Sequence, residues 1–398
     1  MFKNRIFRAV VSGHFAIDVL NSSGAVLLAV LREPLGLSYA QIGAALTAYL
    51  LIGSLSQPVF GWLSDRLAGR WMVLAGAGLA WVALFFALVA VAPTWALLLP
   101  VFMLAPLGSG LFHPIGTAAS ASAIPQRAAS ATSTFFFFGQ LGLAVGPFLA
   151  GALTGHSGAP GLLPLTLLAL IPALMLLRAR HDEAGLAPRR GKPPGATGAA
   201  GAWTVASVAL IAGFVALVAV RSSIQQVYMS FLPQLFQSRG WEPALFGLLS
   251  GAFMGAGAVG QLVSGNLADR YGMRIATVAP LLLGVPAGLF GLLAQPIWAA
   301  FVGCIAAGFL VGGQHSVLVV HAQRLLPVKQ GFAAGLILGF TFASGAIGTA
   351  LAGFLADLVG LETVMLWTTA LGLLAALLAL TLPGRQAVAA APTVASAD

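Results

Sequence analysis

The stretch Gly61-Trp62-Leu63-Ser64-Asp65-Arg66-Leu67-Ala68-Gly69-Arg70 returns later in the chain as Gly265-Asn266-Leu267-Ala268-Asp269-Arg270-Tyr271-Gly272-Met273-Arg274. Glycine, leucine, aspartate, arginine and a closing arginine keep the same offsets in both copies, and Asp269 lies 204 positions after Asp65 (269 − 65). Each copy stands where one long apolar run ends and the next begins. This pattern predicts a membrane transporter built from two equivalent halves.

The composition argues strongly against a soluble protein. The chain is 59% hydrophobic and 7% charged, with a mean hydropathy of +0.97, whereas soluble domains carry about 25% charged residues. Apolar runs of about 20 residues predict membrane-spanning helices, because lipid cannot satisfy open backbone groups. We therefore expect an all-α integral membrane protein with twelve transmembrane helices in two six-helix bundles. The predicted spans are 8–31, 39–63, 71–92, 95–121, 128–153, 160–178, 203–232, 243–267, 275–294, 297–321, 331–355 and 361–382.

The basic residues report topology. With the N-terminus inside, 16 of the 19 lysines and arginines fall in cytoplasmic segments, Arg32 and Arg239 fall in external loops, and Arg221 lies inside a span. This asymmetry is the positive-inside signal, so we expect a multi-pass protein of the cytoplasmic (inner) membrane with both termini cytoplasmic. The net charge of +9 therefore does not indicate a nucleic-acid partner. The first apolar run contains Asp18 and no convincing cleavage site, so it is read as a retained helix.

The domain organisation follows from the repeat. Residues 1–178 and 203–385 are predicted to form the two six-helix bundles, 179–202 a cytoplasmic linker and 386–398 a disordered tail. His113 and His315 are each followed twelve positions later by a proline, and they lie 202 residues apart (315 − 113). Two bundles in one chain can form a central cavity by themselves. We therefore expect a functional monomer, in which the bundles rock to give alternating access.

The repeated segment resembles the loop signature of the major facilitator superfamily. In that family the loop holds the cytoplasmic side shut, and the resemblance implies this role for Asp65 and Asp269. A plain helix-ending turn with positive charges is the alternative. The predicted gate residues are Gly61, Asp65, Arg66, Arg70, Gly265, Asp269, Arg270 and Arg274.

The fifth span contains a run of small residues beside a proline. Gly142, Gly146 and Gly151 share one helix face, and Pro147 stands next to Gly146. This pattern is similar to the Gly-Pro signature of exporters in the same superfamily. A tight crossing of two helices explains it equally well.

Ionisable residues inside the apolar spans point to mechanism, because each costs about 2.5–3.5 kcal/mol to insert and such groups usually face water. His14 and Asp18 are four apart in the first span and share a helix face. Asp18 is the leading candidate for a proton carrier, with His14 beside it and His113 of the fourth span modulating it. A buried pair or local helix link is the structural alternative for Asp18, and also for Arg221 of the seventh span.

Arg221 in the seventh span suits a fixed contact to an anionic group, because a guanidinium keeps its charge. Polar residues nearby on the same helix and on two other spans are predicted to help bind substrate. The predicted substrate-binding residues are Arg221, Gln225, Tyr228, Gln140, His315 and Gln314.

Over nearly its whole length the chain resembles one branch of the superfamily, the fosmidomycin-resistance efflux transporters. It departs from that branch after Pro114, where uncharged residues replace expected charges, and at Arg324, where an acidic residue is usual. The segments that carry the resemblance are His14-x-x-x-Asp18, Gln41-Ile42-Gly43, Gln57-Pro58-Val59-x-Gly61, Phe112-His113-Pro114, Gly142-x-x-x-Gly146-Pro147, Ala322-Gln323-x-Leu325-Leu326-Pro327 and Gly335-Leu336-x-x-Gly339-Phe340.

Motifs typical of hydrolases, metalloproteases and nucleotide-driven pumps are missing from the sequence. We therefore expect no enzymatic activity, no cofactor and no bound metal. The favoured hypothesis is a proton-coupled exporter of a small anionic or zwitterionic compound. The alternatives are an uptake symporter or facilitator for a metabolite, and a membrane sensor that does not transport.

Overall fold

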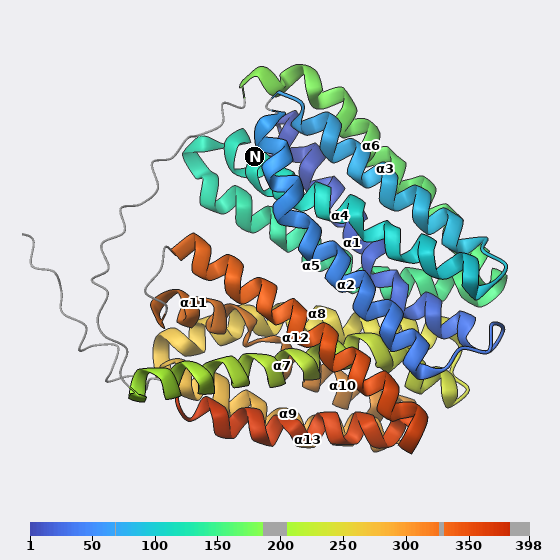
Figure 1. The fold of residues 1–398 in the computed structure, drawn as a ribbon, viewed down its shortest axis with the longest axis vertical. Helices are drawn as coiled ribbons and strands as arrows, with labels where there is room; N and C mark the ends of the chain where they lie inside the picture. The colour runs from blue at the N-terminus through green and yellow to red at the C-terminus, as the bar shows by residue number, and fades with distance from the viewer. Residues whose placement is uncertain (68, 186–204, 326–329, 383–398) are drawn as a thin grey trace, which may run out of the picture. The chain divides into compact units, whose positions relative to one another are not determined.

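The computed structural model describes residues 1–67, 69–185, 205–325 and 330–382, which form helices joined by short turns and no strand (Figure 1). The N-terminal half contains α1 (Arg5–Arg32), α2 (Tyr39–Arg66), α3 (Trp71–Ala90), α4 (Trp95–Ala123), η1 (Pro125–Arg127), α5 (Ala128–Ser157), η2 (Ala159–Leu162), α6 (Leu163–Ala179) and η3 (Arg180–Gly185). The C-terminal half contains α7 (Val205–Ser238), α8 (Pro243–Tyr271), α9 (Met273–Leu293), α10 (Ile297–Gly312), α11 (His315–Leu325), α12 (Gln330–Val359) and α13 (Leu361–Ala379).

Twelve helical segments of the described chain are long and apolar enough to cross a membrane. They coincide with the twelve predicted spans, so the prediction of an all-α membrane protein is confirmed. Long apolar side chains that face outward, such as Leu262 at 68% and Leu167 at 65% exposed, fit helices surrounded by lipid rather than water.

The tenth predicted span, 297–321, is not one continuous helix. α10 ends at Gly312 and α11 begins at His315, with a turn between them. Two successive glycines, Gly312 and Gly313, weaken the helix at this point. The side-chain amide of Gln314 donates to the carbonyl of Leu310, which lies in the last turn of α10.

The chain divides into two compact units. The first comprises Met1–Pro193, Gln226–Gly255 and Ala346–Met365, and the second comprises Pro194–Gln225, Ala256–Gly345 and Leu366–Asp398. The first unit therefore contains the six N-terminal helices together with one end each of α7, α8, α12 and α13. The predicted division into bundles 1–178 and 203–385 is a division by sequence repeat and stays a prediction.

α1 is packed closely against α5 because glycines remove the side chains between them. A Cβ atom added at Gly142 would meet the backbone oxygen of Phe15, and one added at Gly146 would meet that of Val19. Farther along α5, Gly151 takes part in a different contact, with the backbone of Pro243 and Gly247 on α8. One glycine-rich helix therefore brings two neighbours to backbone distance.

Two carboxylates cap helix ends from distant parts of the sequence. Asp357 accepts hydrogen bonds from the backbone amides of Tyr39 (2.8 Å) and Ala40 (2.9 Å) at the start of α2. Glu183 in η3 is buried and accepts from the backbone amides of Trp71 and Met72 at the start of α3. The first residues of the predicted linker are therefore docked on the helices, because a helix N-terminus attracts negative charge. Residues 186–202 of that linker and the predicted tail 386–398 lie outside the described residues.

Candidate functional site

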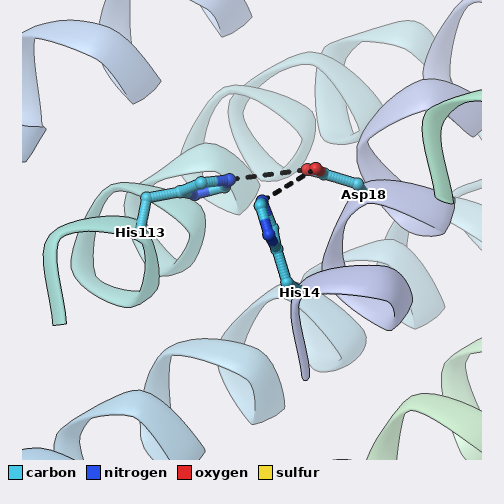
Figure 2. Close-up of side chains that lie close together, drawn as sticks. All are labelled: His14, Asp18 and His113. Atoms are coloured by element: carbon cyan, nitrogen blue, oxygen red, sulfur yellow. Dashed lines mark ion pairs between the residues drawn. The ribbon is translucent and has the colours of Figure 1, made fainter. Parts of the chain in front are cut away.

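The three residues predicted to handle protons lie together in the N-terminal half. Asp18 stands between His14, one turn away on α1, and His113 on α4 (Figure 2). Its Oδ2 lies 3.2 Å from Nε2 of His14, and its Oδ1 lies 3.6 Å from Nε2 of His113. Asp18 and His14 are only 6% and 3% exposed. The helical spacing of four residues explains the first contact, and the packing of α1 on α4 provides the second.

The far side of each imidazole faces a backbone carbonyl. His14 Nδ1 lies 2.7 Å from the carbonyl oxygen of Phe135, and His113 Nδ1 lies 2.8 Å from that of Ser109. A carbonyl oxygen can only accept, so we assign a proton to both Nδ1 atoms. Both Nε2 atoms are thereby directed at the Asp18 carboxylate.

This assignment determines how the cluster can hold protons. If Asp18 is ionised, an imidazole donates to it only when its Nε2 also carries a proton and the ring is positively charged. If the ring is neutral, its Nε2 presents a lone pair, and the proton of the contact must sit on Asp18. Two neutral imidazoles beside an ionised Asp18 would oppose lone pairs at both contacts. The arrangement therefore favours a cluster that holds at least one shared proton.

Three further polar residues complete the surroundings of Asp18. Asn21 Nδ2 donates to Asp18 Oδ1 (3.1 Å) and to Ser109 Oγ (3.0 Å), and the Tyr49 hydroxyl donates to Asn21 Oδ1 (2.7 Å). Ser109 Oγ also lies 3.1 Å from Nδ1 of His113. Sequence reasoning missed this network. Helical spacing could have indicated Asn21, three residues after Asp18, and Ser109, four before His113, but Tyr49 comes from α2.

The α5 side of the cluster is closed by glycine and phenylalanine. A Cβ atom added at Gly139 would meet the His14 ring and would lie 2.8 Å from Asp18 Oδ2. The ring of Phe135 is buried and stacks on His14, with centroids 3.9 Å apart and planes at 21°. Gly139 was not predicted, although its spacing of three from Gly142 could have indicated it. At Gly139 and Gly142, α5 therefore presents its backbone to Asp18.

The ligand atoms of His14, Asp18 and His113 lie within 4.8 Å of one another, a spacing at which one metal ion could be held. The contact of 3.2 Å between His14 and Asp18 is also the length of a direct hydrogen bond. Asn21 occupies one further acceptor site of the carboxylate. All three groups can also gain or lose a proton, and their contacts suit a shared proton.

Arg221, predicted to contact substrate, is buried in α7 and bonded to backbone. Its Nε and Nη2 donate to the carbonyl of Val311 (3.2 and 2.9 Å), and Nη2 also donates to Gly312 (3.0 Å). The last carbonyls of a helix have no partner within it and carry partial negative charge. The guanidinium therefore caps the C-terminus of α10 at the break in the tenth span. This contact is a helix link, which was the structural alternative for Arg221.

The other predicted substrate-binding residues are distributed over three helices and one turn. Gln314 is buried in the turn before α11 and His315 is half-buried at its start. Tyr228 on α7 is buried, and its ring is stacked parallel to Phe253 of α8, with centroids 5.2 Å apart and planes at 8°. Gln225 on α7 and Gln140 on α5 are half-buried.

The predicted gate residues lie where helices end. Gly61 on α2 is close to Pro114 on α4, since a Cβ added there would lie 3.7 Å from the proline side chain. The guanidinium of Arg66 lies 3.8 Å above the ring of Trp62. Arg274 donates to the carbonyl of Leu382 (2.7 Å). Arg70, Asp269 and Arg270 are exposed and Gly265 is half-buried, whereas the side chain of Asp65 lies outside the described residues.

Comparison with known proteins identifies the family. The model of the Major Facilitator Superfamily matches residues 10–228 and 209–395. The chain is 28% identical to the fosmidomycin resistance protein of Escherichia coli (strain K12) over 373 residues, covering 90% of this chain and 88% of that protein. It is also 28% identical to a gallate transporter of Pseudomonas putida over 402 residues, covering 92% and 88%.

A solved structure of a mutant of the nucleoside transporter NupG has the same fold. It superposes with a TM-score of 0.75 over 94% of this chain and 99% of that chain, at 14% sequence identity. Such a low identity supports the fold alone. The family model covers nearly the whole chain, and the twelve apolar helices agree with it. The protein is therefore a multi-pass membrane protein that belongs to the Major Facilitator Superfamily of transporters.

Proposed function

We propose that this protein is a secondary active transporter that exports a small anionic or zwitterionic compound from the cytoplasm in exchange for protons. The observation that carries the proposal is the buried carboxylate of Asp18 held between two histidines. An ionisable residue buried in a membrane-spanning helix is costly, and its retention points to ion or proton handling. The likeness to a fosmidomycin resistance protein supports an exported drug or a related metabolite.

In this proposal the cluster of Asp18, His14 and His113 is the proton site. All three groups change charge by gaining or losing one proton, and both histidines are oriented toward Asp18 by backbone carbonyls. A proton bound here removes negative charge from α1 without requiring another ion. Alternating access then needs only that the two protonation states favour different conformations.

Arg221 provides the fixed positive charge of the C-terminal half, and we propose that it contacts the anionic group of the substrate. Its Nε and Nη2 atoms are held by the carbonyls of Val311 and Gly312, which fix the position of the positive charge. Gln225, Gln314 and His315, which belong to the same compact unit as Arg221, supply further polar contacts in this proposal. Fixed guanidinium forks suit carboxylate and phosphonate oxygens.

The repeated loops are proposed to stabilise the closed cytoplasmic gate through Asp65 and Asp269. The positive-inside distribution of basic residues supports a cytoplasmic location for these loops and for both termini, in the bacterial inner membrane. One chain contains both halves of the repeat, so we propose that the monomer transports.

An uptake symporter is the second candidate, because the chain is similar over 92% of its length to a gallate transporter. The same fold and the same proton site would serve net flux in the opposite direction. Counterflow in vesicles with pH gradients of either sign distinguishes the two. If the compound accumulates inside vesicles when protons move inward, and does not leave them in exchange for protons, the protein is an uptake symporter.

The test is substrate-induced proton movement in proteoliposomes, using fosmidomycin and a panel of anionic and cationic compounds. We expect an anionic compound to move protons in the wild type and not in Asp18→Asn. Asp182→Asn is the matched control, because Asp182 is exposed in η3 and should leave the signal unchanged. Full proton-driven transport in Asp18→Asn would refute the assignment of Asp18.

A further inference from the structure

We propose that Asn21 is a positioning residue that reverses the hydrogen bonds between Asp18 and Tyr49 when Asp18 gains a proton. The protonation state of α1 is thereby transmitted to α2. This inference rests on the proposed function, in which Asp18 takes up and releases protons. It assigns roles to Asn21, Tyr49 and Ser109, which lie beyond the cluster of Asp18 and its two histidines.

Both N–H groups of Asn21 and its amide oxygen form hydrogen bonds in the structure. One N–H of the amide goes to Asp18 Oδ1 (3.1 Å) and the other to Ser109 Oγ (3.0 Å), while the amide oxygen accepts from the Tyr49 hydroxyl (2.7 Å). An ionised carboxylate can only accept, so it requires the nitrogen of the amide on its side. The orientation seen here is therefore the one that belongs to an unprotonated Asp18 Oδ1.

A proton on Asp18 Oδ1 reverses this requirement. The carboxyl group then donates. Asn21 lies closer to Oδ1 (3.1 Å) than Nε2 of His113 does (3.6 Å), so the acceptor is the amide oxygen of Asn21 after a half-turn of the amide about one side-chain bond. The amide nitrogen now faces Tyr49 and donates to its oxygen. Ser109 follows, because a hydroxyl can donate as well as accept. The bound proton stays on Asp18, and only hydrogen bonds change partners.

The reversal changes what Tyr49 can do. In the structure its hydroxyl proton is committed to Asn21. After the reversal the oxygen accepts from Asn21, so the hydroxyl proton must find another acceptor. Tyr49 is 7% exposed and its ring is packed against Phe86 and Phe102. A change of partner there acts on α2, the helix whose start is capped by Asp357 and whose end carries the first copy of the repeated loop.

No other charge near the network competes with this assignment in the described part of the N-terminal helices. Around Asp18 the titratable groups are His14 on α1, His113 on α4 and Tyr49 on α2. α5 presents Gly139 and Gly142. The helices α3 and α6, which also pack on α1, contain no ionisable residue apart from Arg178 in the last turn of α6.

A purely structural role for Asn21 would give a different result. As a bridge between α1 and α4, the residue would stabilise the fold, but the hydrogen bond of Tyr49 would not follow the protonation of Asp18. The distinguishing measurement therefore reports the hydrogen bonding of Tyr49 itself, without any transported compound. Infrared difference spectra of the full-length protein in lipid bilayers, recorded as the pH is changed, provide it.

We expect two signals to change together in the wild type. One is the carboxyl band of Asp18, identified by its loss in Asp18→Asn. The other is the ring C–O band of Tyr49, identified by its loss in Tyr49→Phe. In Asn21→Leu the Tyr49 band should lose its shift while Asp18 still titrates. Ser54→Ala is the matched control on α2, because its hydroxyl donates to the carbonyls of Leu50 and Leu51 on the same helix, and both signals should persist.

The outcomes separate the two proposals. A Tyr49 band that does not shift while Asp18 titrates, or one that still shifts in Asn21→Leu, would overturn the role of Asn21 alone. The absence of any titrating Asp18 band would overturn both proposals. If Asn21→Leu fails to fold, Tyr49→Phe removes a single oxygen atom and serves instead. It should keep both the Asp18 band and the pH-dependent change in the Asn21 amide band, because the reversal is driven by Asp18; an amide band that does not change while Asp18 titrates would overturn the role of Asn21.

Discussion

The two halves of the repeat place opposite charges at corresponding positions. Arg221 lies 203 residues after Asp18 (221 − 18), close to the spacing of 202 between His113 and His315 and of 204 between the two loops. Asp18 contacts His14 and Asn21 on α1 and His113 on α4, and Asn21 connects it to Tyr49 on α2. These side chains can exchange protons or redirect their hydrogen bonds. Arg221 is held by backbone carbonyls at a helix break.

The contrast shows how one architecture can support two electrostatic roles. Side-chain partners allow the charge at Asp18 to change, because histidine, tyrosine and serine accept alternative proton positions. Backbone carbonyls can only accept hydrogen bonds, so they suit Arg221 only while its guanidinium is protonated and donates. The N-terminal site is therefore suited to switching, and the C-terminal site to holding a constant positive charge.

The largest effect is expected from removing that constant charge. Arg221→Gln should lower the free energy of unfolding by about 3 kcal/mol, because the carbonyls of Val311 and Gly312 lose charged donors. Affinity for anionic compounds should fall as well. Thermal unfolding in detergent and binding isotherms measure the two effects.

Arg239→Gln is the matched control for Arg221→Gln. Arg239 pairs with Glu362 at a partly exposed site, and such pairs contribute little. If Arg221→Gln leaves the affinity for anionic compounds unchanged, Arg221 does not contact the substrate and serves only as a helix cap.

A methyl group placed against the cluster of Asp18, His14 and His113 should have the next largest effect. Gly139→Ala introduces a Cβ atom that would meet the His14 ring and Asp18 Oδ2, and overpacking of this kind costs about 1–3 kcal/mol. Proton release on substrate addition should weaken in parallel. Gly213→Ala on α7 is the control, because its nearest neighbours lie at 3.6 and 3.8 Å. Equal behaviour of the two variants would show that α5 does not confine the cluster.

The two histidines should differ in importance. His14 is closer to Asp18 than His113 is (3.2 against 3.6 Å) and is more deeply buried. We expect His14→Gln to weaken proton binding by the cluster by about 1 kcal/mol more than His113→Gln does. This difference is the scale of one hydrogen bond. Proton uptake by each purified variant over a range of pH measures the difference. A larger effect of His113→Gln would show that His113, and not His14, is the more important partner of Asp18.

The smallest effect is expected at the start of α2, away from both charged sites. Asp357→Asn keeps a hydrogen-bonding side chain and removes the charge that faces the amides of Tyr39 and Ala40. Loss of a charge at a helix N-terminus costs about 0.3–1 kcal/mol. The melting temperature should fall slightly, and less at high salt. A loss as large as that of Arg221→Gln would mean that Asp357 anchors the fold.

Several features of the molecule followed from residue order. Apolar runs near 20 residues predicted the helices, because a backbone in lipid must satisfy its own hydrogen bonds. The repeated loop predicted two halves, and helical spacing placed His14 beside Asp18. The break in the tenth span was not predicted. Its apolar composition is continuous, and Gly312-Gly313 is ambiguous where glycine is common in membrane helices.

The groups that surround each charge could not be found in this way. Tyr49 reaches Asn21 from another helix, and Gly139 approaches Asp18 because it lacks a side chain, so neither contact follows from local spacing. The partners of Arg221 are carbonyl groups, which every residue carries and no side-chain pattern can reveal. Residue order was enough to place ionisable residues inside a twelve-helix membrane protein. Many of their hydrogen-bond partners depended on the packing of helices, because they lie far apart in the chain, from 28 positions between Tyr49 and Asn21 to 121 between His14 and Phe135.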